Sequence, residues 1–468
     1  MTCRSAFSMA NYKLGPNTLL SDNSEKTHQK SKLTLFVIAS FLISPLFFQM
    51  SNGVFNDTSF YFNSGGELAL LPLPLSTIMS FVGIVLLGGL TKARLTIAVL
   101  LLTSVGMLAV TALLAMEHGS IKKSKFILLA QYVLPMCALV LGQQYGVRPG
   151  AINIMAKAFT LILVLAVPAQ LISTLTSGLS ILSPSLFLFS AHQHLQYIPV
   201  IFVGAFLVAI FTLWEFHSYR LLLSILAGLM GAYVSLSLSI LAIVFLISGM
   251  VCFSGHTILL RKKGFYTSAI TLLTTFILVC SLASNDSEAL KEKLGAYTPS
   301  KASLEIDEIG GNTDEVVFET PSKISPEDDK VAFSTPQNLA ERAIYLTFYI
   351  EEIVQNSSSI LLGHLEPPDR GNYPSAHNYY VDFIYNFGAL AIIPLLGLAG
   401  FTAYSVIRNF PKIFISSQIL GIAGVVLFLL FADNMFKVGM RQPYPGLMTF
   451  YLWGVLLALL AKLERRKL

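Results

Sequence analysis

An uncharged stretch of forty residues, from 221 to 260, limits the possible folds of this chain more than any other feature. A helix rises about 1.5 Å per residue, so a single helix of this length is about twice as long as the roughly 30 Å hydrocarbon core of a bilayer. The chain must therefore turn near the middle of the stretch. Three serines, Ser235, Ser237 and Ser239, predict that turn at a membrane face.

Polar surface is scarce throughout the chain. Charged residues make up 12% of the sequence and hydrophobic residues 54%, whereas a soluble globular protein carries about 25% charged residues. This composition excludes a soluble enzyme and a nucleic-acid-binding domain, because too little charge remains to cover a surface in water. The apolar runs are continuous, unlike the alternating strands of a membrane barrel. The sequence therefore predicts an all-α polytopic membrane protein in contact with membrane lipid.

Apolar windows between charged residues predict about twelve transmembrane helices. Nine of them fall within residues 33–284 and the last three within 382–468, with one large loop between the two groups. The predicted spans are 33–51, 68–90, 95–116, 126–146, 152–175, 197–214, 221–236, 237–259, 265–284, 382–407, 413–431 and 444–461.

The positions of lysine and arginine set the orientation of these spans. With the polar tail 1–32 in the cytoplasm, 19 of the 31 basic residues fall on the inner side. Lys122, Lys123 and Lys125 oppose this arrangement, because it places them outside. We expect both termini to be cytoplasmic and the large loop to lie on the outer face.

The large loop, residues 285–381, has two parts. Residues 285–334 are acidic and rich in turn-forming residues, which predicts a mobile segment. Residues 335–381 are expected to be partly helical, because Thr335 followed by proline is typical of a helix start. Apolar residues then recur at helical spacing to about Asn356. The candidate active-site residues of the loop lie in this second part.

His377 is the most informative histidine of the chain. Ser375 is placed to cap the tenth span, which predicts His377 in the first turn of a helix at the membrane surface. The positive end of a helix disfavours an imidazolium and keeps the ring neutral. A neutral imidazole is what a general base needs to take a proton from a hydroxyl. An interfacial polar residue without a chemical role is the alternative, and position alone does not decide.

Arg342 is the second candidate, on the predicted helix of the loop. It shares a face with Tyr345 and Tyr349, at i+3 and i+7. An arginine beside aromatic hydroxyls at the bilayer surface can bind a diphosphate through its planar fork. A solvated arginine paired with Glu341 or a lipid headgroup is the alternative. The same ambiguity applies to three other cations of the outer face, Arg370, Lys437 and Arg441.

The sequence predicts neither a metal site nor a cofactor. His192 and His194 alternate in the way that metal-binding imidazoles can, but no acidic or thiol partner lies nearby in the sequence. Walker, GxGxxG and HExxH motifs are absent from the sequence. We therefore expect no metal, no bound nucleotide and no nucleic-acid partner.

The segment from Ala376 to Gly388 resembles a motif of the O-antigen ligase and O-antigen polymerase family. In that family a His-Asn pair in the large outer loop is followed, after nine residues, by a glycine in the next span. Here His377-Asn378 is followed by nine residues and Gly388. The upstream Glu341-Arg342 pair, a helix and Leu361-Leu362-Gly363 resemble the arginine, helix and glycine turn of the same family. The resemblance covers about residues 197–461 and is strongest over 338–400.

The resemblance implies a metal-independent, inverting glycosyltransferase in the bacterial inner membrane. The donor would be a glycan linked to undecaprenyl diphosphate, used on the periplasmic side. By this resemblance His377 matches the catalytic histidine and Arg342 the arginine held to bind the diphosphate. Tyr345, Arg441, Arg370 and Asn378 are further candidate substrate-binding residues, and Asn378 either orients the imidazole or caps the helix.

Three alternatives stay open. The acceptor is lipid A-core if the protein is a ligase, which the His-Asn spacing favours, or a lipid-linked glycan if it is a polymerase. A transporter of polysaccharide or lipid-linked oligosaccharide is a different class, but the spans offer few charges to line a path.

The chain departs from the family pattern at one position that bears on phosphate binding. The family often has Ser-Arg-Gly between the seventh and eighth spans, whereas this chain has serines and leucines at 235–239. Arg441, Lys437 or Arg370 would have to supply the missing charge.

Overall fold

The computed structural model describes residues 18–45, 47–48, 73–119, 121, 123–177, 197–237, 239–260, 264–285, 339–366 and 375–465. Several predictions lie outside these residues. They concern the acidic part of the large loop, the helix start at Thr335, the His192–His194 pair and Arg370.

The described residues are almost entirely helical, as predicted. A single antiparallel pair of two-residue strands, β1 (Phe47–Phe48) and β2 (Leu73–Pro74), joins the ends of the first two helices. The longer helices are α1 (Thr18–Ile43), α2 (Leu75–Leu87), α3 (Arg94–His118), α4 (Lys123–Gly146), α5 (Ala151–Ser177), α7 (Ile198–Leu213), α8 (His217–Ser237), α9 (Ile240–Leu259), α10 (Phe265–Asn285), α12 (Leu339–Val354), α14 (Tyr379–Arg408), α16 (Ser417–Phe428) and α18 (Pro443–Arg465). The shorter elements are η1 (Leu90–Ala93), α13 (Ser357–Leu362), α15 (Phe410–Ile415), the π-helical turn η3 (Leu429–Asp433), α17 (Asn434–Phe436) and η4 (Gly439–Arg441).

Eight helical segments among the described residues are long and apolar enough to cross a membrane. They are Leu90–Glu117, Lys125–Gly146, Ala151–Ile172, His217–Ser235, Ile240–Leu259, Tyr379–Arg408, Ser417–Phe436 and Pro443–Arg465. Four shorter apolar helices, Ser31–Ile43, Leu75–Leu87, Ile198–Leu213 and Tyr266–Leu278, overlap the other predicted spans. The chain is therefore an all-α polytopic membrane protein, and the number twelve stays a prediction.

Prolines shorten the first two of the predicted spans. Helix α1 ends at Ile43 rather than continuing to 51, and α2 begins at Leu75 rather than 68. Pro45 has no backbone N–H and restricts Ser44 before it, so the helix ends there. Pro74 occupies the N-cap position of α2, where its fixed backbone suits a helix start.

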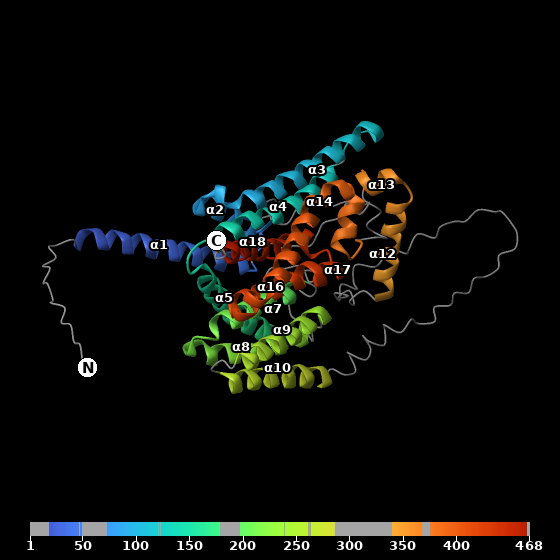
Figure 1. Cartoon of the computed structure of the whole chain (residues 1–468). Coiled ribbons are helices and arrows are strands. Elements are labelled where there is room, and N and C mark those ends of the chain that lie inside the picture. The colour runs from blue at the N-terminus through green and yellow to red at the C-terminus, as the bar shows by residue number, and fades with distance from the viewer. Residues whose placement is uncertain are drawn as a thin grey trace, which may run out of the picture.

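The predicted turn in the uncharged stretch is confirmed. Helix α8 ends at Ser237, α9 begins at Ile240, and Ser239 has extended backbone angles between them. The forty-residue stretch therefore forms two helices, which lie next to α10 at one edge of the bundle (Figure 1).

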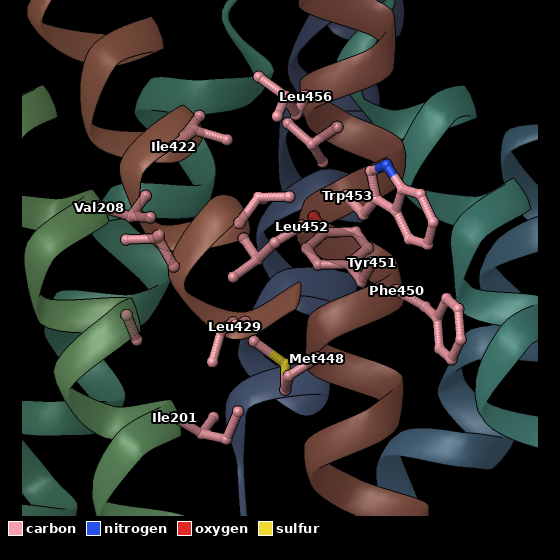
Figure 2. Packing of buried hydrophobic residues seen from close by; sticks show 14 of the residues in the cluster. Ile201, Val208, Ile422, Leu429, Met448, Phe450, Tyr451, Leu452, Trp453 and Leu456 are labelled. Atoms are coloured by element: carbon pink, nitrogen blue, oxygen red, sulfur yellow. The ribbon is translucent and has the colours of Figure 1, made fainter. Parts of the chain in front are cut away.

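Helix α18 occupies the centre of the bundle (Figure 1). Every residue from Pro443 to Leu460 is buried. Figure 2 shows its apolar side chains facing those of α7 and α16, with Met448 and Leu452 towards Leu429 and Val208. On the opposite side, α18 packs closely on the backbone of α4, and two glycines allow this approach. A Cβ at Gly142 would overlap the Tyr451 carbonyl, and a Cβ at Gly454 would overlap the Leu139 carbonyl. This core fixes the ends of the helices that carry the candidate site.

Candidate functional site

The backbone at the start of α14 differs from the prediction in one respect. Asn378, not Ser375, is the N-cap, because its Oδ1 accepts hydrogen bonds from the backbone N–H groups of Tyr380 (3.0 Å) and Val381 (3.1 Å). Its Nδ2 donates to the Met435 carbonyl at 3.2 Å. The predicted cap at Ser375 is therefore wrong, because asparagine satisfies two amides at the first turn. Of the two roles considered for Asn378, the structure shows the capping role.

His377 consequently precedes the helix instead of lying in its first turn. It is the one non-glycine residue with positive φ, +51°, in the described part of the chain. Its ring is 5.8 Å from that of Tyr345 between centroids, with the planes inclined by 20°. The residue is 9% exposed. Strained backbone at a polar, buried residue is more common at functional sites than elsewhere, so this position supports a chemical role for the imidazole.

A glycine break in α14 fixes the segment that follows His377. Gly388 has φ +72° and ψ 168° inside the helix, a conformation that only glycine adopts readily. Helix α13 packs on the break so closely that a Cβ at Gly388 would overlap the Leu361 carbonyl. A Cβ at Gly363 would lie 2.6 Å from the Gly388 nitrogen. The structure thus brings together the two glycine motifs on which the family resemblance depends.

The backbone carbonyls beside the break receive hydrogen bonds from outside the helix. The His364 N–H donates to the Tyr385 carbonyl at 2.8 Å. The buried ammonium of Lys125, which is 2% exposed, donates to the carbonyls of Asn386 (2.5 Å) and His364 (2.7 Å) and lies over the Phe387 ring. Lys125 was one of the lysines that opposed the predicted orientation, and the structure gives it a local function in joining α4 to this break.

A buried ion pair connects α14 to η4. Arg441 donates to the Asp382 carboxylate at 2.6 Å, and the Tyr132 hydroxyl donates to the same oxygen. Arg441 is 6% exposed. Burial opposes its charge, but Asp382 outweighs that effect and the pKa of the guanidinium lies above its ordinary value. The predicted substrate-binding residue Arg441 is therefore already held by a protein carboxylate.

Tyr197, just before α7, is a buried tyrosine of this region. Burial raises its pKa to about 12, and the charges of Arg441, Arg342, Asp433 and Asp382 all act on it. The Lys437 ammonium is 5.7 Å from the centre of its ring.

The same region holds a second buried ion pair. Lys437 lies 3.6 Å from Asp433 and is 5% exposed. Burial lowers the pKa of this ammonium, Asp433 opposes that shift, and the neighbouring charge of Arg342 adds to it. Arg342 itself is half-buried on α12.

Most of the predicted site residues therefore come together. His377 and Tyr345 are stacked, Asn378 caps the start of α14, and the charges of Arg342 and Arg441 both act on Tyr197. No group of three or more His, Cys, Asp and Glu residues that could hold a metal ion occurs within the described ranges.

The sequence interpretation gave no role to Asp382, Tyr132 or Tyr197. Asp382 could have been identified from the sequence, because ionisable residues within membrane spans are rare and usually functional. The two tyrosines carried none, since they are distant from the motif in the sequence and reach it only through the packing of α4 and α7.

Comparison with family models, with curated proteins and with solved structures finds no match for this chain.

Proposed function

We propose that the protein is a membrane glycosyltransferase that moves a glycan from undecaprenyl diphosphate to an acceptor hydroxyl. The observation that carries the proposal is the position of His377, which lies on strained backbone and is stacked on Tyr345, one helical turn from Arg342 on α12. The next residue, Asn378, donates to the Met435 carbonyl, two residues before Lys437. The likeness of its motif to the O-antigen ligase and polymerase family supplies the substrate class.

The mechanism needs only two kinds of group from the protein. The acceptor oxygen attacks the anomeric carbon of the donor sugar, the bond from that carbon to the phosphate oxygen breaks, and His377 takes the hydroxyl proton. The electron pair leaves with the diphosphate, whose growing charge is stabilised by cations. Holding acceptor and donor in this arrangement supplies the remaining acceleration.

The alternation of the predicted spans supports an outer-face site in a bacterial inner membrane. Counting from a cytoplasmic N-terminus, the fourth, sixth and tenth spans begin on the outer side and the eleventh ends there. In the structure, Lys125 at the start of α4, Tyr197 before α7, His377 before α14 and Lys437 after the eleventh predicted span all belong to this one region. Twelve spans, the periplasmic loop and cytoplasmic termini belong to this proposal.

The test is transfer by the purified protein from an undecaprenyl-diphosphate-linked glycan. We expect His377→Gln to lower the transfer rate at least about 100-fold, because general base catalysis contributes that much or more, while the melting temperature stays unchanged. His217→Gln, at an exposed histidine that begins α8, is the matched control and should keep full activity. A folded His377→Gln variant with normal activity would refute the assignment.

The acceptor decides between the two branches of the family. We propose the ligase, so transfer should occur to lipid A-core. Transfer only to a second lipid-linked glycan would instead identify a polymerase of surface polysaccharide repeats.

A further inference from the structure

The corner between α12 and α13 leaves four large apolar side chains exposed. Their exposed fractions are 42% for Ile350, 62% for Val354, 37% for Ile360 and 47% for Leu361. The sequence has no aspartate, glutamate, lysine or arginine from residue 353 to residue 365, although the corner belongs to a loop that is otherwise hydrophilic. Apolar side chains that gather on a surface in this way mark a binding surface, whereas single exposed ones need no explanation.

The opposite face of α12 is already used for packing within the protein. Tyr349 and Ile353 are buried against α14, and the Tyr349 ring lies 4.8 Å from the Tyr385 ring between centroids. The exposed residues of the corner therefore form a second apolar surface, which the fold of the described residues does not cover.

The length of α14 shows at which level of a membrane this corner lies. Gly388 is twenty residues before Arg408, the last residue of α14. At about 1.5 Å per residue, this part of the helix is about 30 Å long, which matches the hydrocarbon core of a bilayer. A charged residue at one end of such a segment belongs at one edge of the core, so the break at Gly388 lies at the other edge.

Helix α4 gives the same level independently. Its apolar segment, Lys125–Gly146, has 22 residues and is likewise long enough for one crossing. The Lys125 ammonium at its start donates to the carbonyl of Asn386, two residues before the break. Two different helices therefore place Gly388 at the edge of the hydrocarbon core.

Helix α13 lies at this edge, because it packs directly on the break. A Cβ at Gly388 would overlap the Leu361 carbonyl, and Figure 1 shows α13 beside α14 and one end of α3. Just inside the break, Leu390 and Ile393 are 50% and 58% exposed on the membrane-spanning part of α14, where they face lipid. The exposed apolar surface of the corner thus adjoins the lipid-facing surface of α14.

We infer that the α12–α13 corner is a membrane anchor, which inserts Ile360 and Leu361 between the headgroups and acyl chains of the leaflet on the His377 side. Short apolar helix faces bind this boundary by entering it about 5–10 Å deep. The anchor holds α12, whose Tyr345 is stacked on His377. The inference goes beyond the proposed function and depends on it only for the identity of this leaflet as the outer one.

The experiment measures tryptophan fluorescence of the full chain reconstituted in vesicles of phosphatidylcholine and phosphatidylglycerol. Ile360→Trp and Leu361→Trp each add one indole at the corner, and two positions keep the test available if one variant does not fold. The native Trp214 and Trp453 are buried, so the difference from wild type reports the added indole. The quenchers are lipids brominated near the headgroup, lipids brominated near the chain ends, and aqueous iodide.

We expect lipid brominated near the headgroup to quench the added emission at both positions, more strongly than lipid brominated near the chain ends. Two further variants are the controls. Ile393→Trp, on the lipid-facing surface of α14, should be quenched by both lipids. Gln355→Trp replaces an exposed residue of α12 whose amide bonds to Glu352, and its quenching by either lipid should be several times weaker.

Quenching of both corner variants by iodide and not by brominated lipid would place the corner in water and overturn the inference. Protection from all three quenchers would overturn it as well, because protein, either a second copy or another segment of the chain, would then cover the corner. Stronger quenching by bromine near the chain ends would refute the position at the boundary. None of these results depends on glycosyl transfer, which the transfer assay judges separately.

Discussion

Replacing Gly388 with alanine tests whether the break in α14 is needed for the site. Gly388 has φ +72° and ψ 168°, which an alanine adopts at a cost of roughly 1–3 kcal/mol. The added methyl group would also overlap the Leu361 carbonyl. To relieve that overlap, α13 must move away from α14 and lose the 2.8 Å hydrogen bond from His364 to Tyr385, which is worth about another 1 kcal/mol.

The two effects add, because backbone strain and the lost bond are separate contributions. We expect Gly388→Ala to lower the free energy of unfolding by about 3 kcal/mol. The assay is the melting temperature of the detergent-solubilised protein, with hydrogen exchange of residues 359–366 as the local measurement. Melting should occur several degrees lower, and amides of α13 should exchange faster than in the wild type.

The same helix offers a matched control. Gly400 has helical backbone and nothing within 4 Å of an added Cβ, so Gly400→Ala should be neutral or stabilise the protein by up to about 1 kcal/mol. The reasoning fails if Gly388→Ala melts like Gly400→Ala and leaves exchange in α13 unchanged, because the close approach of α13 would then have no energetic consequence.

Two further predictions concern the residues that join α13 and α4 to the break. Burial lowers the pKa of His364, so below about pH 6.5 the unfolded state binds the proton more readily than the folded state and stability falls as pH falls. The melting temperature should therefore drop less between pH 7.5 and 5.5 in His364→Gln than in wild type, and an equal drop would contradict a titrating His364. Lys125→Met removes the donor to two carbonyls and should destabilise the protein by roughly 1–3 kcal/mol in chemical or thermal unfolding, against no measurable change in Lys412→Met.

Hydropathy patterns predict most of the helices of this chain, because a bilayer requires a similar length and an apolar surface of every helix that crosses it. The break at Ser237–Ser239 and the helices α3 to α5 follow the predicted ranges closely. The predicted ends of the first two spans near Pro45 and Pro74 are wrong, because hydropathy does not report backbone restrictions. A proline ends or begins a helix through its backbone geometry.

The candidate site was predictable only where its residues are close in the sequence. His377, Asn378 and Gly388 belong to one motif, and Arg342 lies one helical turn from Tyr345. Lys437 pairs with Asp433, four residues before it, but the partner of Arg441 depends on which helix ends meet, and no periodicity within one segment contains that information. The structure therefore changes the interpretation of Arg441 most, from a substrate-binding cation to one held by Asp382.

The first turns of α14 join the break at Gly388 to the buried Asp382–Arg441 ion pair. Asp382 holds Arg441, and it lies within the first turns of α14, between the cap at Asn378 and the break at Gly388. This short segment is tied at one end to Met435 through Asn378, and at the other to α13 and α4 through His364 and Lys125. A shift at Gly388 would therefore move His377 and the Asp382–Arg441 pair together. In the proposed mechanism the base and the cation that Asp382 holds keep their spacing best when one rigid segment positions both, since small displacements of reacting groups reduce rates strongly.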